Sequence, residues 1–306
     1  MIPSALSIGG YGPEESSHGA GLDAFRRVVE TGTGGDVTVP ITWNIMKEGR
    51  RNTDLFDLVE TGEMFMCYFS TSYLGDRVSA LDVLETPFLF DDLGSAHAAL
   101  DGPLGERLRR AVRTSTGFEA LGFWDNGFRH MTNRLRPVHA PAEFEGMRVR
   151  MQPNKIHEEL IRCWGAIPVA VELSHAIELI TRLEVEAQEN PLANTVAYGV
   201  DRVHRFVTMT GHLYGARGLF AHRPTFESLD SGFRTIVETA VTTAVQTQRT
   251  AAAEIEASLR VQMEIDGIQF VDLTADERTE FVEKSAPAID MAHRTVPGDL
   301  YELVER

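Results

Sequence analysis

The segment Gly146–Leu192, GMRVRMQPNKIHEELIRCWGAIPVAVELSHAIELITRLEVEAQENPL, decides the fold of this chain. The alternating residues 147–151 predict a short strand that carries Arg150, and residues 185–189 predict a second strand that leads into Asn190. Helical and strand patterns of the soluble α/β type lie between them. A guanidinium on a rigid strand binds a carboxylate through two parallel hydrogen bonds, so Arg150 is the first candidate for a ligand-binding group.

Composition bounds the class of protein. A chain of 306 residues is too long for most single cores and predicts two lobes. Its hydrophobic content of 43% and charged content of 24% are those of an ordinary globular protein. The net charge of -16 argues against nucleic acid as a partner, and it requires any anion site to be a local positive pocket. No run of 18 apolar residues is present to span a membrane.

The two cysteines, Cys67 and Cys163, stand in apolar or amphipathic stretches and are interpreted as buried small hydrophobic residues. A disulfide between them is not expected, and neither belongs to a cluster of zinc ligands. We therefore expect no metal and no cofactor.

Strand and helix patterns alternate along the chain, which predicts crossover units and a mostly parallel sheet. Residues 64–69 form a continuously apolar run, as expected of a buried strand. Residues 226–262 are rich in Ala, Glu, Gln and Thr and predict one long helix. A helix of about 30 residues spans about 45 Å, which is too long for one small domain.

Several stretches together resemble one protein family. The arginine strand followed by QENP (Gln188–Pro191), the segment WDNGFRHMTN (Trp124–Asn133), the stretch Asn44–Leu74 and the loop ETPFLFDD (Glu85–Asp92) are similar to the solute-binding proteins of TRAP (tripartite ATP-independent periplasmic) transporters, in the DctP-like group. The resemblance covers about residues 4 to 300. Each piece alone is weak, but QENP combined with the upstream arginine strand is specific.

The resemblance implies a two-lobed periplasmic-binding-protein fold of the α/β class. Each lobe has a mixed, mostly parallel sheet flanked by helices, and a long helix spans both. Lobe I would comprise residues 1–124 and 212–250, and lobe II residues 125–211 and 251–306, with a ligand cleft between the lobes. No linker or repeat in the sequence marks these boundaries, so they rest on the family.

The resemblance assigns ligand roles to two residues of lobe II. Arg150 matches the family arginine that pairs with the ligand carboxylate; the alternative is a structural arginine paired with Glu143 or Glu145. Asn190 matches an asparagine that contacts the same carboxylate or an adjacent hydroxyl, and it is also suited to cap the helix that starts near Pro191.

The other candidates are less specific. Arg129 is either a second basic contact or a solvated strand residue, and Gln152 shares the strand face of Arg150. Ser70 and Tyr73 follow the buried strand of lobe I, where ligands of open α/β sheets bind. Tyr11 and His18 belong to a glycine-containing loop that lacks a nucleotide-binding motif, and a lone histidine more often has only a local structural role. Leu173 stands where many relatives have an aromatic residue, so the part of the ligand beyond the carboxylate is not predicted.

We therefore expect a periplasmic, monomeric receptor that binds a small organic acid and delivers it to a TRAP-type membrane permease. Dicarboxylates, hydroxy or keto acids, sugar acids and aromatic acids remain open. The alternatives are a hydrolase or lyase acting on a carboxylic acid, and a ligand-sensing subunit of a sensor kinase. An enzyme would need a nucleophile or an acid–base pair, and no such motif is present; His157, beside Glu158 and Glu159, is interpreted as solvated. Met1-Ile2-Pro3 lacks the regions of a signal peptide; the resemblance implies that the leader has been removed, and the alternative is a cytoplasmic protein.

Overall fold

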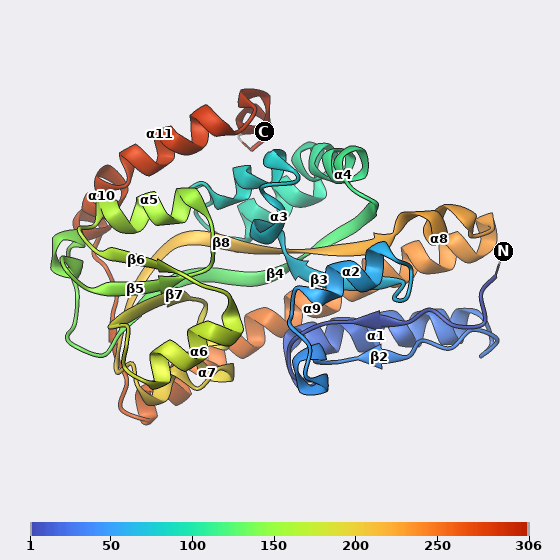
Figure 1. Ribbon diagram of the computed structural model, residues 1–306, viewed down its shortest axis with the longest axis horizontal. Helices are drawn as coiled ribbons and strands as arrows, with labels where there is room; N and C mark the ends of the chain where they lie inside the picture. The colour runs from blue at the N-terminus through green and yellow to red at the C-terminus, as the bar shows by residue number, and fades with distance from the viewer. Residues whose placement is uncertain (1, 305–306) are drawn as a thin grey trace. The chain divides into compact units, whose positions relative to one another are not determined.

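The computed structural model describes residues 2–304 and divides the chain into two compact units. Unit 1 comprises Met1–Thr71, Ala98–Asp125 and Ala216–Glu254, and unit 2 comprises Ser72–His97, Asn126–Gly215 and Ile255–Arg306. The chain passes from one unit to the other between Thr71 and Ser72, and then inside helix α3 (Leu93–Asp101), strands β4 (Phe118–Asn133) and β8 (Phe206–His222) and helix α9 (Ser231–Ile265) (Figure 1). Helices and strands are both abundant, and parallel and antiparallel pairs occur together, so the fold is α/β with a mixed sheet, as the sequence predicts.

Unit 1 is built on three short strands beside β4 and β8. Strand β1 (Ile8–Gly9) is parallel to both β2 (Ile41–Thr42) and β3 (Met66–Ser70). All five residues of β3 are buried, which explains the continuous apolar run in the sequence. Strand β3 is antiparallel to β8, so the carboxyl end of β3 at Ser70 meets Arg217 of β8.

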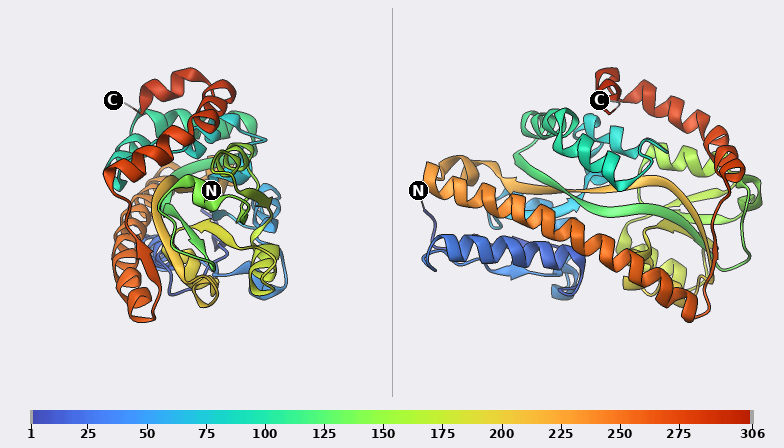
Figure 2. Two further views of the ribbon diagram at one scale, coloured as in Figure 1. Left: turned by 90° about the vertical axis from the view of Figure 1, so that its left-hand side faces the viewer. Right: turned by 180° about the vertical axis from the view of Figure 1, so that it is seen from behind.

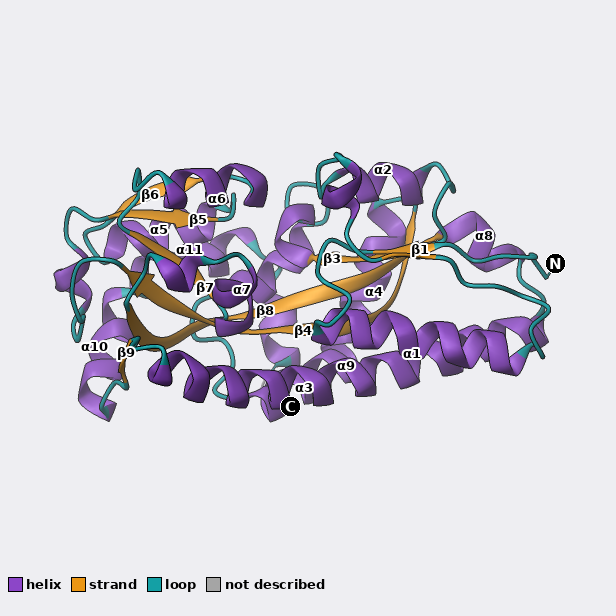
Figure 3. Ribbon diagram, turned by 90° about the horizontal axis from the view of Figure 1, so that it is seen from below, coloured by secondary structure: helices purple, strands orange, loops and turns teal. Residues whose placement is uncertain are grey.

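The helices of unit 1 include α1 (Ser17–Gly32), α2 (Asp54–Glu60), α4 (Pro103–Ser115) and α8 (Arg223–Ser228). Ser16 caps α1 by accepting a hydrogen bond from the Gly19 backbone N–H at 3.1 Å. The first part of α9 runs antiparallel along α1 (Figures 2 and 3). Two glycines permit this close approach: a Cβ at Gly32 would lie 2.9 Å from Ile236, and one at Gly21 would lie 3.1 Å from Gln248.

The strands of unit 2 follow the order β4, β7 (Ala187–Asn190), β5 (Arg148–Met151), β6 (Ile167–Ala170). Strand β5 is parallel to β7 and to β6, whereas β7 is antiparallel to β4. Strand β9 (Gln269–Val271) pairs in parallel with β8. The carboxyl ends of β7, β5 and β6 therefore lie at one edge of the sheet, the edge at which α/β proteins bind ligands.

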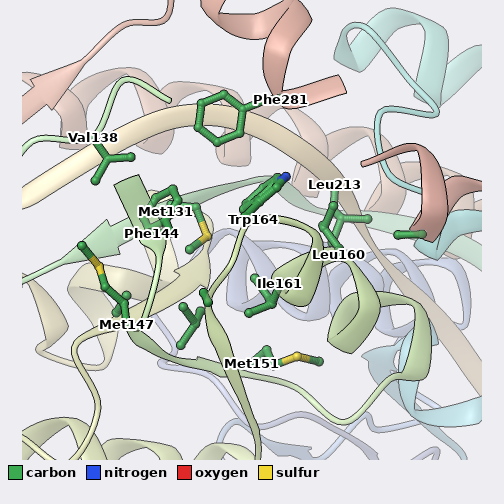
Figure 4. Packing of buried hydrophobic residues seen from close by; sticks show 14 residues of the cluster. Met131, Val138, Phe144, Met147, Met151, Leu160, Ile161, Trp164, Leu213 and Phe281 are labelled. Carbon is green, nitrogen blue, oxygen red and sulfur yellow. The ribbon is translucent and has the colours of Figure 1, made fainter. Parts of the chain in front are cut away.

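Helices cover both faces of the unit 2 sheet. Figure 1 shows α5 (Lys155–Cys163) and α11 (Ala286–Thr295) on one side of β5–β7, and α6 (Leu173–Thr181) and α7 (Leu192–Ala197) on the other. Trp164 at the end of α5 packs edge-on against Phe281 of α10 (Ala275–Lys284) at 5.1 Å between ring centroids, with Phe144 alongside (Figure 4). This cluster fixes the strand that carries Arg150, because Val149 and Met151 are fully buried in it.

Three expectations from the sequence need correction or refinement. The long helical pattern begins at Ser231 rather than Phe226, because α8 ends at Ser228 and Asp230 Oδ1 accepts a hydrogen bond from the Phe233 N–H. Its 35 residues correspond to about 52 Å, and they fall in both units. Residues 72–97, placed in lobe I by the sequence interpretation, group with unit 2, where the Phe88 N–H donates to the His212 carbonyl at 2.9 Å.

Helix α3 (Leu93–Asp101) begins inside this segment and ends in unit 1. Within residues 2–304, no helix is both long and apolar enough to cross a membrane. Both cysteines are free thiols; Cys67 is buried, as predicted, and Cys163 is partly exposed.

Candidate functional site

Arg150 is held at the carboxyl edge of the unit 2 sheet. In the parallel ladder it lies opposite Gln188 of β7 and Val169 of β6. Strand β7 ends two residues later at Asn190, and strand β6 is followed directly by Val171. Three strand ends therefore converge on the Arg150 guanidinium, and the buried residues on either side of it fix the direction of its strand.

The Arg150 side chain is buried, with an exposed fraction of 3%, yet no described acid pairs with it. Its Nη2 donates to the Val171 carbonyl at 3.0 Å, and its Nε has no hydrogen-bond partner among the described residues. Burial lowers the pKa of Arg150, and nearby Tyr73 and Glu189 only partly oppose this effect. The alternative pairing expected from the sequence is wrong: exposed Glu143 accepts from the His139 N–H at 2.6 Å instead.

The Arg129 side chain is buried and, unlike that of Arg150, is already paired with a carboxylate. Its Nε and Nη2 donate to the Glu189 carboxylate, and Nη2 also donates to the Glu189 carbonyl at 2.9 Å. Both side chains are almost fully buried. Burial opposes the charge of Arg129, but the Glu189 carboxylate outweighs it, so the pKa of Arg129 lies above its ordinary value. The interpretation of Arg129 as a solvated strand residue is therefore wrong.

Asn190 closes β7 and lies opposite His130 of β4. Its Oδ1 accepts a hydrogen bond from Asn194 Nδ2 at 3.0 Å, which leaves its own Nδ2 as a donor without a partner in the described chain. It is not the helix cap that the sequence suggested: α7 is preceded by Pro191 at the cap position, without a side-chain capping bond. Asn190 thus contributes an N–H donor on the strand that pairs with β5, two residues beyond Gln188, which lies opposite Arg150.

The remaining candidates of unit 2 lie at the same edge or just beyond it. Gln152 directly follows β5 and is buried, and Leu173 is the buried first residue of α6. Tyr73 lies in a 3-10 helix, Thr71–Leu74, and its charge would act on both arginines. A residue that the sequence interpretation missed, Tyr198, lies at the end of α7; burial raises its pKa to about 12, so its phenol is neutral.

Tyr11, His18 and Ser70 belong to unit 1. The Tyr11 N–H donates to the Tyr68 hydroxyl at 3.2 Å, and the ring of His18 stacks on Tyr68 at 4.8 Å between centroids. Arg217, missed in the sequence, lies opposite Ser70 in the β3–β8 ladder. Its guanidinium sits 4.8 Å above the Tyr11 ring centroid, and burial lowers the pKa of Arg217 to about 9. The sequence signal that could have identified Arg217 is its position inside the apolar stretch of β8.

His157 also differs from its interpretation as a solvated residue. It is 1% exposed, and its Nε2 lies 2.7 Å from Oε2 of buried Glu85. Ile156, His157, Leu160 and Ile161 share the buried face of α5, so the helical spacing itself contained this information. The described residues contain no group of three or more His, Cys, Asp or Glu side chains arranged to hold a metal ion.

A family model described as "Bacterial extracellular solute-binding protein, family 7" (DctP) matches residues 8–295. The chain is 27% identical over 274 residues to a solute-binding protein of Verminephrobacter eiseniae, covering 90% of this chain and 80% of that one. It is 26% identical to the C4-dicarboxylate-binding periplasmic protein DctP of Rhodobacter capsulatus, covering 92% and 84% of the two chains.

Its fold is similar to the crystal structure of a TRAP periplasmic solute-binding protein from Polaromonas sp. JS666 bound to D-erythronate. The TM-score is 0.91 at 25% identity, and the match covers 99% of this chain and 98% of the other. These matches confirm the family resemblance and the fold inferred from the sequence. The chain belongs to the bacterial extracellular solute-binding proteins of family 7, the DctP family.

Proposed function

We propose that this chain is a periplasmic solute receptor that binds the carboxylate of a small organic acid on Arg150 and passes the acid to a TRAP-type membrane permease. Its relatives carry the names of C4-dicarboxylate-binding and solute-binding proteins, and the Polaromonas protein holds D-erythronate. The role is binding rather than catalysis, and we expect the receptor to act as a monomer.

The charge balance around Arg150 supports this proposal. The groups that act on its charge are Arg129, Glu189 and the phenols of Tyr73 and Tyr198. Two guanidinium groups and one carboxylate leave one net positive charge, because the Arg129–Glu189 pair is neutral as a unit. A buried charge without a counter-ion is costly, and a bound carboxylate removes that cost.

The hydrogen-bonding groups also suit a carboxylate. Arg150 offers Nε, and Asn190 offers Nδ2, neither of which has a partner among the described residues. A carboxylate has two oxygens with about four acceptor positions, and it accepts from a guanidinium and an amide at once. Neutral amides or esters of the same acid lack the negative charge, and we expect the site to reject them.

The Arg129–Glu189 pair makes unit 2 a site for one carboxylate. The sequence left open whether Arg129 would take a second carboxylate beside Arg150. Nε and Nη2 of Arg129 already bind Glu189, and only Nη1 has no partner within the described chain. We therefore propose that Arg129 aligns Glu189 and offers at most one further hydrogen bond to the ligand.

Isothermal titration calorimetry with wild type, Arg150→Met and Arg148→Met tests the proposal. Arg148 is a matched control, because it lies on the same strand but is exposed. We expect small carboxylic acids to bind wild type and Arg148→Met alike. The Arg150→Met variant should lose about 2–5 kcal/mol of binding free energy. Equal affinity of all three proteins for the acid would contradict the assignment of Arg150.

The transport role requires its own test. Vesicles that contain a TRAP permease should accumulate radiolabelled acid only when the receptor is added on the outside. Arg150→Met receptor should not support this uptake. Uptake that does not require the receptor would contradict the proposed role with the permease. It would not contradict the binding of the acid.

A further inference from the structure

Asn194 joins two other side-chain amides of unit 2. It lies in α7, four residues beyond Asn190, and its Nδ2 donates to Asn190 Oδ1 at 3.0 Å. The same Nδ2 donates to Oδ1 of Asn126 in β4, also at 3.0 Å. An amide nitrogen carries two hydrogens, so these two bonds use both of them. All three residues belong to unit 2, and the bridge is therefore complete within one unit.

Helix α7, which carries Asn194, is attached to its surroundings by two side-chain contacts. Thr195 Oγ1 accepts from Gln188 Nε2 of β7 at 3.4 Å, and Glu256 Oε1 of α9 accepts from the Leu192 N–H at 3.4 Å. Burial raises the pKa of Glu256, and the backbone N–H groups at the start of α7 partly oppose this effect. These contacts hold Asn194 beside the end of β7.

The second acceptor, Asn126, is confined by the neighbouring strand. A Cβ at Gly215 of β8 would lie 3.0 Å from Asn126 Cβ and 3.1 Å from Asn126 Nδ2, so this side chain packs directly on the backbone of β8. One hydrogen of Asn194 is bound at this confined oxygen, and the other is bound at Asn190. A reversed Asn194 amide would bring its own oxygen against both acceptor oxygens, which disfavours the reversal.

The bridge selects one orientation of the Asn190 amide. A rotation of this amide by 180° exchanges its oxygen and its nitrogen, and its hydrogen bonds decide between the two orientations. The donor of Asn194 requires the oxygen of Asn190 on its own side, so Nδ2 of Asn190 takes the other side. This Nδ2 has no hydrogen-bond partner among the described residues. A carboxylate accepts from such a nitrogen, whereas the oxygen of a reversed amide would repel it.

We infer that Asn194 is a positioning residue for acid binding, because it orients Asn190 so that the N–H donor meets the carboxylate. The inference rests on the proposed function, since it specifies how Asn190 takes part in binding. Asn194 acts through Asn190 and does not have to touch the acid. The competing role is a purely structural link between α7 and β4, which would not depend on the orientation of Asn190.

Hydrogen exchange of the side-chain amides tests the orientation without any ligand. In ¹⁵N-labelled protein, Asn190→Ala and Asn194→Leu assign the two pairs of NH₂ signals by their loss. Both hydrogens of Asn194 are bonded, so we expect them to exchange at least about tenfold more slowly than those of Asn190. Equal rates, or slower exchange at Asn190 than at Asn194, would overturn the inference.

Calorimetry with D-erythronate separates positioning from a structural link. Asn194→Leu removes the donor without adding charge, and Asn194→Asp replaces it with an acceptor that turns the Asn190 amide around. Ala197→Asp adds the same charge at an exposed position of α7 and is the matched control. We expect the affinity to fall about tenfold in Asn194→Leu and about a hundredfold in Asn194→Asp, and to stay unchanged in Ala197→Asp.

Urea unfolding of the same variants measures the loss of the link itself. A structural link alone would lower the unfolding midpoints of both Asn194 variants and leave the affinity of the folded protein unchanged. That result, or equal losses of affinity in Asn194→Leu and Asn194→Asp, would refute the inference. If both variants bind as wild type does while Arg150→Met loses binding, the positioning role fails and the proposed function stands. If Arg150→Met binds as tightly as wild type, the proposed function itself fails.

Discussion

Replacing Arg150 and Arg129 separately distinguishes a guanidinium kept for a ligand from one that holds the fold together. The two arginines lie in the same unit and are equally buried, but Arg129 has a protein counter-ion, and Arg150 has none among the described residues. Methionine is a suitable replacement for both, because it keeps most of the apolar stem and removes the charge. Without ligand, only the Arg129 variant should lose stability.

The magnitudes follow from the contacts. Arg129→Met leaves Glu189 buried without its cation, and breaking a buried pair costs about 3–5 kcal/mol. Arg150→Met loses one charge-assisted hydrogen bond to the Val171 carbonyl, worth about 1.5–3 kcal/mol. The substitution also removes the desolvation penalty of a buried charge, which amounts to several kcal/mol. This gain is about as large as the loss of the hydrogen bond, or larger. We therefore expect Arg150→Met to stay within about 1 kcal/mol of wild type or to exceed it.

Urea unfolding of the ligand-free proteins, followed by circular dichroism, measures both effects. The unfolding midpoint of Arg129→Met should fall clearly, while that of Arg150→Met should not. Arg148→Met controls for the loss of a positive charge from the same strand. A loss of stability in Arg150→Met as large as that in Arg129→Met would show that the protein itself holds the Arg150 charge, and the reasoning would be refuted.

Three further outcomes follow from the same structure. Glu189→Met should lose about 3–5 kcal/mol of stability, and the double variant Arg129→Met/Glu189→Met should recover much of it; additive losses in a double-mutant cycle would argue against the pair. Phe281→Ala should cost about 3–5 kcal/mol in urea unfolding, because Phe281 is fully buried against Trp164; a loss below 1 kcal/mol would argue against this packing. Stability should fall as the pH is lowered from about 6.5 to about 4. Burial lowers the pKa of four histidines in the folded protein, so in this range the unfolded chain binds more protons than the folded one. Urea midpoints across this range test the sign, and a rise toward acid would contradict it. These histidines are His18, His130, His204 and His212.

Asp82 contributes to the pH dependence of stability with the opposite sign to the histidines, in the same pH range. Burial and the nearby Glu85 raise the pKa of Asp82 to about 6, so its contribution to stability increases as the pH falls from about 6 toward its ordinary value near 3.8. Glu256 has the same sign, because burial raises its pKa, so two carboxyl groups oppose four imidazoles. The slope with pH should therefore be reduced but not reversed.

Local patterns in the sequence were sufficient for elements whose signal lies within one segment. The apolar run of β3 and the Ala- and Glu-rich pattern of α9 predicted a buried strand and a long helix, and both are present. The short strand of Arg150 was identified for the same reason. The alternation of Val37, Val39 and Ile41 predicts a strand over residues 36–42, but only Ile41–Thr42 form one, and Thr38 makes an isolated bridge to Ala5.

The sequence could not show pairings between distant segments. Whether Arg129 would face a ligand or Glu189 depends on β4 and β7 lying side by side, which no local pattern reveals. The same holds for Arg217, which reaches Ser70 only through the β3–β8 ladder. His157 is different, because its helical spacing already placed it on the apolar face of α5, and the acidic residues that follow it obscured that signal.

A crystal structure of the complex with D-erythronate tests the central claim most directly. Two carboxylate oxygens of the acid should lie within hydrogen-bonding distance of the Arg150 guanidinium, with Asn190 Nδ2 donating to one of them. A carboxylate bound elsewhere on the chain, with the contacts of Arg150 unchanged, would contradict the account.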